Sequence, residues 1–431
     1  MAAVSGLGPF GGDDPFGGMS AMFNQILGTF GADPSQGWDQ AKQLAGAIAN
    51  EGSAESNVDP LDRMRLADLA RVAELHVTQT TGLTVPGAGA ATTVSAVNRA
   101  QWADATLDAY RPLFEQLTSS LGTAMRQQLA DISPEDLEAM GPMFGSGDPR
   151  AFLDGLGKML GPVMLSMMAG STVGHLGRRA FGSYSLPIPR PLAEPTLIVV
   201  SNVDEFGRDW SIPSDDLRLA VCLEELTHRV VLGVPHVRGT IEELLAAHAA
   251  GFTTDAAGIE ERVGELHFDS PEGLDALQEL LSDPNVVLGA IRSPAQEELL
   301  PKLDAVITVV EGYVDWVLDQ IGARLLTSFG QLAEAMRRRR VETDQASRFV
   351  ERLFGLELTQ DTLDRGSAFM HGVVERAGPH ALDRLWSDAA NLPTPAEIEA
   401  PGLWLARTGD DQTLPELPRD LEIPDFPDLD S

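Results

Sequence analysis

The sequence predicts a mainly α-helical protein with at most a few short strands. Apolar residues recur at three- and four-residue spacing, the period of an amphipathic helix, in the segments at 37–50, 59–77, 96–130 and 133–144. The clearest strand candidate is the short β-branched run PTLIVVSNV at 195–203. With 431 residues and an apolar content of 43%, the chain can bury a substantial core, spread over roughly two to three domain-sized units.

The order of these elements divides the chain into four predicted parts. Residues 1–35 are rich in Gly, Phe and Asp without sustained periodicity, which predicts a flexible tail. An N-terminal helical lobe follows at 36–185, and the Pro-rich stretch near residue 185 predicts its border with a second lobe at 186–407. Residues 408–431 hold eight acidic residues, one Arg and four prolines, which predicts an acidic, disordered tail.

Charge and cysteine content disfavour several classes of protein. The formal net charge of -33 argues against nonspecific attraction to nucleic acid or to an anionic membrane. The single cysteine, Cys222, cannot form an intramolecular disulfide, and such sparse use of cysteine is typical of the reducing cytoplasm. The first 14 residues lack a basic residue and a continuous apolar run, so we expect no secretory signal. The uncharged stretch at 159–177 is long enough to span a bilayer, but Pro162 and its small residues suit close helix packing, so we expect no membrane insertion.

A helix with a distinctive polar face is predicted between Pro213 and Gly233. A serine and two aspartates supply its start, and Gly233 supplies its stop. Its centre reads EELTH, and Glu224 and His228 lie four residues apart on one helical face. Zinc peptidases of the H-E-x-x-H type place two metal ligands in this way, and the Glu between them takes a proton from metal-bound water. Here Glu224 stands in the place of the first His, and Glu225 in the place of that base.

A third ligand is expected from the apolar helix predicted at 303–322, which carries Glu311 and Asp315. Valine and isoleucine neighbours place Glu311 in the interior, where a carboxylate is costly unless it is neutralised, paired or metal-bound. In zinc peptidases whose third ligand is Glu, an Asp four residues later often orients a helix-borne His through its free ring nitrogen. The alternative is a structural ion-pair network with nearby arginines, which would repair a site that no longer binds metal.

The chain resembles the zincin-like metallopeptidases common in actinobacteria, some of which are associated with deazaflavin-cofactor biosynthesis. The resemblance rests on ordered blocks along most of the chain: GWDQAKQLA, SLPIPRP, EELTHRVVLGVPHVR, VVEGYVDWVLDQIG, RRRR, FVERLFGLEL, VVERAGPHALDRLW, NLPTPAEI and WLAR. It implies a helical zincin-like fold, a peptide or protein substrate, and zinc. It also implies that Glu224, His228 and Glu311 ligate the metal and that Glu225 is the general base.

The exchange of His for Glu at position 224 separates two functional hypotheses. A carboxylate can bind zinc through oxygen, but two glutamate ligands would offset the metal charge and leave its bound water less acidic. Such a site also favours harder ions, such as manganese or magnesium, over zinc. The first hypothesis is therefore a zinc-dependent hydrolase of peptide bonds with reduced activity. The second is an inactive homologue, a pseudoenzyme, whose cleft binds a peptide or protein.

Two residues are candidate accessory parts of the site, and a basic run is a separate feature of the sequence. His236, in GVPHVR, could serve as a substitute ligand or a substrate contact, although a structural hydrogen bond is the simpler interpretation. Tyr313 could steady an oxyanion, but its offset of two residues from Glu311 directs it to another helix face. The basic run from Met336 to Arg340 is expected to pair with acidic groups of this chain or of a partner, because the chain is strongly acidic.

Overall fold

The computed structural model describes residues 34–53, 55–86, 94–131, 167–252, 293–342 and 345–409. Within these ranges the protein is mainly helical with two short strands, which confirms the predicted fold class. No helix in this part of the chain is both long and apolar enough to cross a membrane. The predictions for residues 1–33, 133–144, 159–166 and 410–431 lie outside the described residues.

Three of the predicted N-terminal helices are present with small changes at their ends. They are α2 (Pro34–Ala49), α3 (Pro60–Thr81) and α4 (Arg99–Asp131). The start of α3 is fixed by Asp59, whose side chain accepts a 2.7 Å hydrogen bond from the main-chain N–H of Leu61. Helix α2 packs along α4, and α3 packs along the helix that carries the EELTH motif.

The two strands form a small parallel sheet that joins distant parts of the chain. Strand β1 (Val94–Val97) pairs with β2 (Thr196–Val199) in register from Val94 opposite Thr196 to Val97 opposite Val199. The strand predicted at 195–203 is thus shorter than expected, because α7 (Val200–Asp209) begins directly after β2. Val200, Val203 and Gly207 recur at helical spacing and are buried, so burial along a helix face outweighs the β propensity of this run.

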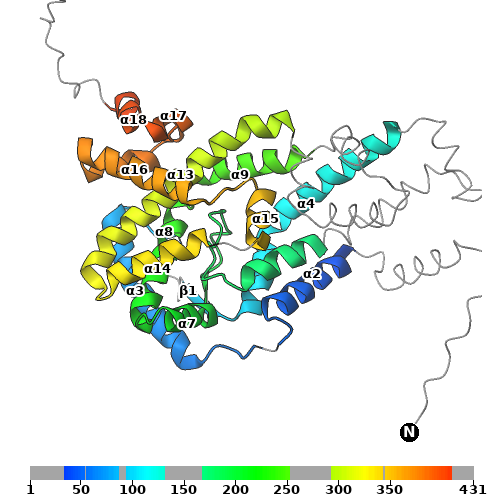
Figure 1. The fold of residues 1–431 in the computed structure, drawn as a ribbon, viewed down its shortest axis with the longest axis horizontal. Helices are drawn as coiled ribbons and strands as arrows, with labels where there is room; N and C mark the ends of the chain where they lie inside the picture. Colours follow the sequence, from blue (N-terminus) through cyan, green and yellow to red (C-terminus); the bar gives the residue numbers. More distant parts are fainter. Residues whose placement is uncertain are drawn as a thin grey trace, which may run out of the picture.

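The motif helix is α8 (Ser214–Val231), and further helices follow it along the chain. They are α9 (Pro235–Ala250), α13 (Pro294–Leu325), α14 (Phe329–Val341), α15 (Gln345–Leu353), α16 (Gln360–Ala377), α17 (Pro395–Glu399) and α18 (Pro401–Thr408), with the 3-10 turns η1 (Pro379–Trp386) and η2 (Ala389–Asn391). Figure 1 shows α8, α13 and α14 close together in the body of the protein. Helix α13 contacts α8, α9, α14 and α16.

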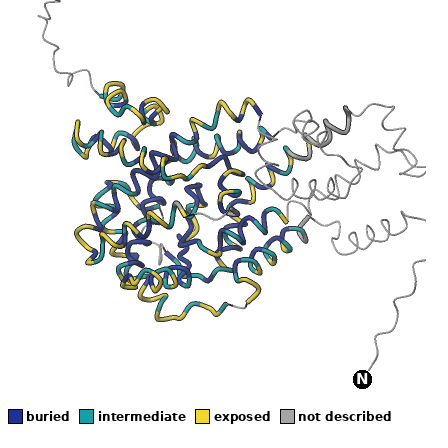
Figure 2. Tube along the Cα trace, viewed as in Figure 1, coloured by how far each residue is buried: buried dark blue, intermediate teal, exposed yellow. Residues whose placement is uncertain are grey.

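One hydrophobic core runs through the described part of the chain. It includes residues from α2 at Trp38 to α18 at Trp404, and Figure 2 shows the buried positions concentrated on the inner faces of the helices. The strands β1 and β2 lie on either side of the border predicted near residue 185 and pair with each other. The division of the chain into lobes at that border stays a prediction.

A glycine contact sets the spacing between α13 and α16. A methyl group built on Gly312 would lie 2.5 Å from the main-chain carbonyl of Gly366, and one built on Gly366 would lie 2.5 Å from the carbonyl oxygen of Thr308. The two main chains therefore touch where the helices cross. This crossing fixes the position of α13, and with it the neighbouring Glu311.

We predict that Gly312→Ala lowers the free energy of unfolding by about 2–3 kcal/mol, because overpacking at a main-chain contact forces the helices apart. Urea denaturation followed by circular dichroism measures the change. Gly239→Ala, on α9 where nothing lies within 4 Å, is the matched control and should stabilise the helix by about 0.5–1 kcal/mol. Similar effects of the two substitutions would contradict the close-packing interpretation.

Candidate functional site

The motif lies in the middle of α8, as predicted. The helix begins after Pro213 with Asp215 and Asp216 in its first turn, where acidic side chains favour the positive end of the helix dipole. It ends at Val231, before Gly233, and packs against α3, α7, α13 and β2. Most of its residues are buried, including Glu225 and His228 of the motif, and Glu224 is half-buried.

A short extended segment beside β2 holds Glu225. Gly182 forms an antiparallel bridge with Ile198, and the main-chain N–H of Tyr184 donates a 3.0 Å hydrogen bond to Oε2 of Glu225. A methyl group on Gly182 would lie 2.3 Å from the carboxyl carbon of Glu225, so a larger residue at this position would displace that carboxyl group. Burial raises the pKa of Glu225 to about 7, although His228 and the N–H of Tyr184 oppose that shift.

His228 is held between two hydrogen-bond acceptors. Its Nδ1 lies 3.0 Å from the carbonyl oxygen of Glu224, and its Nε2 lies 3.0 Å from Oε1 of Glu311. The ring stacks on Tyr184 with centroids 5.8 Å apart. Burial lowers the pKa of His228, but Glu311 more than offsets it and raises that pKa to about 8. With Glu311 ionised, both ring nitrogens donate, so the side chain is an imidazolium.

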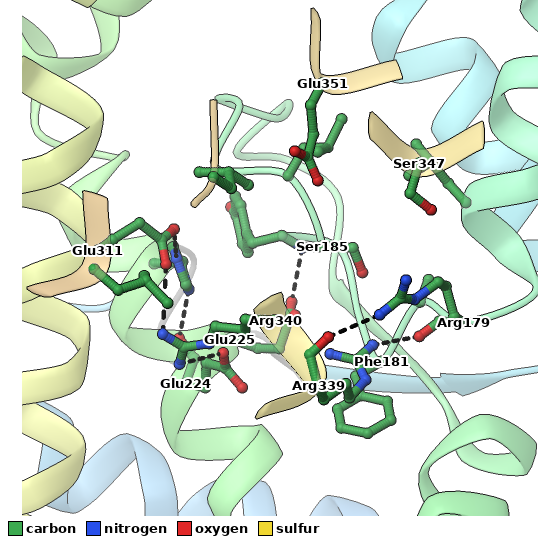
Figure 3. Close-up of a pocket in the computed structure, with 17 residues that line it drawn as sticks. Arg179, Phe181, Ser185, Glu224, Glu225, Glu311, Arg339, Arg340, Ser347 and Glu351 are labelled. Carbon is green, nitrogen blue, oxygen red and sulfur yellow. Dashed lines mark hydrogen bonds and ion pairs between the residues drawn. The ribbon is translucent and has the colours of Figure 1, made fainter. Parts of the chain in front are cut away.

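Arg340, from the end of α14, supplies a second positive charge to this cluster. Its guanidinium lies 2.8 Å from Oε1 of Glu224, 2.7 Å from Oδ1 of Asp315 and 3.6 Å from Oε2 of Glu311. Figure 3 shows the arginine beside these glutamates. Burial disfavours its charged form, but Asp315, Glu224 and Glu311 together raise the pKa of Arg340 above its usual range. Three carboxylates from two helices thus share one guanidinium.

The pKa values of Glu311 and Asp315 depend on burial and on these two cations. Burial would raise the pKa of Glu311, but His228 and Arg340 outweigh it and lower that pKa below its usual range. Burial raises the pKa of Asp315, with Arg340 opposing the shift. The cluster is therefore built as a buried network of ion pairs rather than as a group of uncompensated carboxylates.

A small cavity lies over the motif helix. Its volume is about 80 Å³. One ordered water needs ~10–15 Å³ on this measure, so the cavity has room for about half a dozen waters. Glu224, Glu225, His228 and Arg340 are among the residues that line it. Tyr184 also lines the cavity, as do Phe181, Ser185, Arg339, Ser347 and Glu351, which Figure 3 labels.

The arrangement of these side chains does not suit a metal ion. In the part of the chain that the structure describes, no three His, Cys, Asp or Glu side chains are grouped so that they could hold one. Nε2 of His228, the nitrogen expected to ligate, is hydrogen-bonded to Glu311. Glu224 and Glu311 already pair with Arg340, whose guanidinium places a positive charge among the predicted ligands. A protonated imidazole offers no lone pair to a metal.

The sequence-predicted residues are brought together in part. Glu224, Glu225, His228, Glu311 and Asp315 converge, but Asp315 pairs with Arg340 rather than with the histidine ring.

The two accessory residues lie apart from the cavity. The Tyr313 ring packs against Trp386 with centroids 4.8 Å apart. His236 has Nε2 3.4 Å from the carbonyl oxygen of Leu385, the structural hydrogen bond named as the simpler interpretation.

Sequence reasoning did not place Arg340, Arg339 or Tyr184 at the site. The sequence signal for the two arginines was the basic run itself. Along this helix, Arg337 and Arg338 are exposed, whereas Arg339 and Arg340 are half-buried. No sequence signal pointed to Tyr184, whose position depends on the pairing of its segment with β2.

These features define a class of protein: a helical fold in which an E-x-x-H helix faces a glutamate on a neighbouring helix. The family model described as zincin-like metallopeptidase matches residues 37–405, and the chain belongs to that family. Among solved structures it is similar to a presumed hydrolase with a novel fold from Chloroflexus aurantiacus. The two share 23% identity with a TM-score of 0.53, over 86% of this chain and 97% of the other, which shows a common fold. No curated protein matches the chain.

We predict that Arg340→Met lowers the free energy of unfolding by about 3 kcal/mol at pH 8, because it leaves buried carboxylates without their counter-charge. Urea denaturation measures the loss. Arg338→Met is the matched control on the same helix: its side chain is 58% exposed and pairs with Glu334, so the change should be below about 0.5 kcal/mol. Equal losses in the two variants would contradict a structural role for Arg340.

We also predict that the His228 imidazole titrates with a midpoint near pH 8 in an NMR experiment, assigned by its absence in His228→Gln. Because the folded pKa lies above the ordinary 6.5, the stability that His228 contributes is fully present below pH 6.5 and is lost as the pH rises through about 8. The loss is about 2 kcal/mol. A midpoint at or below pH 6.5 would show that the imidazolium pair with Glu311 does not form.

Proposed function

We propose that this protein is a noncatalytic member of the zincin-like metallopeptidase family whose cavity over the motif helix binds a peptide or protein segment. The observation that carries the proposal is the guanidinium of Arg340 among Glu224, Glu311 and Asp315. A guanidinium supplies a permanent positive charge and hydrogen-bond donors, so it can compensate buried carboxylates. It has no open coordination position and cannot acidify a water as a metal does.

Binding is supported by the cavity that remains beside this network. Its lining combines the motif side chains with apolar groups such as Phe181 and Leu358. Concave sites with mostly apolar walls and a few convergent polar groups are typical of ligand sites. Family membership supports a peptide as the ligand, because it is the substrate class of peptidases.

The hydrolytic alternative has one specific observation in its favour. Glu225 is a buried carboxylate with a pKa of about 7, and it lines the cavity where a general base would stand. In that alternative, Glu224, His228 and Glu311 would hold zinc or a harder divalent ion. Arg340 would first have to leave its three partners, and His228 would have to lose a proton.

Metal content and hydrolysis separate these two functions. We predict that protein purified without chelator or nickel contains far less than one divalent ion per chain by elemental analysis. We also predict that wild type and Glu225→Gln show the same background hydrolysis of a mixed peptide substrate. One ion per chain, together with hydrolysis that Glu225→Gln abolishes, would overturn the proposal.

The double variant Glu224→His/Arg340→Met is the complementary test, and it should gain affinity for zinc because a nitrogen ligand returns and the internal cation is removed.

The binding part of the proposal is tested by selecting intact peptides from a random library on immobilised wild-type protein. Leu358→Trp, which fills the cavity, should weaken the selected binding at least about tenfold, whereas Leu403→Trp, at a position that is 57% exposed, should leave it unchanged. If no peptide is selected, or if Leu358→Trp does not weaken the binding of the selected peptides, the result would count against a binding cavity.

A further inference from the structure

A pair of arginines on the wall of the cavity has no role in the ion-pair network of the motif. Arg179 follows the helix at 167–177, and Arg339 lies near the end of α14. Both line the cavity, and Figure 3 shows them side by side. Their positions are fixed reciprocally: Nη2 of Arg179 donates a 2.7 Å hydrogen bond to the carbonyl oxygen of Arg339, and Nη2 of Arg339 donates to the carbonyl oxygen of Arg179.

An aromatic platform orients one of the two guanidinium groups. The Cζ atom of Arg339 lies 3.4 Å from the centroid of the Phe181 ring. Phe181 is itself held edge-on by Phe206, with ring centroids 5.2 Å apart. The N–H groups of a guanidinium that stacks on a ring lie in the plane of the guanidinium and point outward from its edge, where acceptors can reach them. The platform therefore preorganises Arg339 for hydrogen bonding.

The charge of this pair is not balanced by an acidic partner. Among the described residues, neither Arg179 nor Arg339 forms an ion pair with a carboxylate, and each uses one of its five N–H donors in the reciprocal bonds. Burial lowers the pKa of Arg339 to about 9, opposed by Glu224 and reinforced by Arg179 and Arg340. By contrast, Arg340 on the same helix pairs with several carboxylates. A partly buried cation without a counter-ion is costly, and a bound anion would remove that cost.

The acids that line the same cavity do not supply this anion. Glu224 pairs with Arg340, and Glu225 accepts from the N–H of Tyr184. Burial raises the pKa of Glu351 to about 7, opposed by the N–H of Leu358 and by Arg179, so that it carries only part of its charge at neutral pH. The rest of the wall is largely apolar, with Leu176, Ala180, Leu186, Leu358 and Leu363.

We propose that Arg179 and Arg339 form a carboxylate-binding subsite and that its ligand is the C-terminal residue of a peptide with an apolar side chain. The two guanidinium groups would receive the terminal carboxylate through charge-assisted hydrogen bonds, and the leucines would receive the side chain. This inference rests on the proposed function, because it names the part of a peptide that the cavity recognises. It requires no chemical step.

The test compares the binding of N-acetyl-L-leucine and N-acetyl-L-leucinamide to the full chain at pH 7, by isothermal titration calorimetry and ligand-observed NMR. The acid should bind, and the amide, which lacks the charge but keeps the shape, should bind at least about tenfold more weakly. Equal binding of the two, or no binding of the acid at millimolar concentration, would overturn the proposal. This comparison uses wild-type protein and needs no variant to fold.

Variants then assign the subsite to its residues. Arg179→Met and Arg339→Met should each weaken the binding of the acid about 10- to 100-fold, whereas Arg339→Lys, which keeps the charge, should retain part of it. Arg338→Met is the matched control, because Arg338 is exposed and pairs with Glu334, and it should not change binding. Unchanged binding in folded Arg339→Met would exclude this subsite. A metal-loaded, hydrolytic wild type would refute the noncatalytic function, and the acid and amide comparison would still report separately on the subsite.

Discussion

The need to balance buried carboxylates determines how the centre of this protein is built. Glu224, Glu311 and Asp315 converge from α8 and α13 into an interior where uncompensated negative charge is costly. A divalent ion is one way to meet that need, and the guanidinium of Arg340 together with the imidazolium of His228 is another. The second arrangement satisfies the same charges with side chains of the chain itself. It gives the fold its stability at this point without the chemistry that a metal would provide.

The helices that carry these charges are placed by packing at a distance from them. Gly312 and Gly366 let α13 and α16 meet at their main chains, and this contact positions Glu311 one residue away. The segment around Gly182 runs beside β2 and directs the N–H of Tyr184 at Glu225. The ion-pair network can form because these uncharged contacts have already brought its members within hydrogen-bond distance.

Family membership and local chemistry inform different parts of the functional account. The match over residues 37–405 establishes the zincin-like metallopeptidase family and a helical fold. The chemistry of this particular chain depends on single side chains, since Glu224 is an oxygen donor on the motif helix and Arg340 lies against it. Function belongs to the site and not to the fold, so membership of a peptidase family does not by itself establish hydrolysis.

The sequence by itself determined the helical class and the position of the motif helix, with Glu224 and His228 on one face, because helical periodicity and four-residue spacing are local properties. The expectation that Glu311 joins them came from the family resemblance. The sequence also offered an ion-pair network with arginines as the alternative to a metal. It could not choose between them, since the partner of Glu224 lies 116 residues away at Arg340. The short β2 strand and the place of Tyr184 depended likewise on pairing between distant segments. Only the tertiary structure decided which cation meets the carboxylates, because electrostatic pairing depends on distance in space and not along the chain.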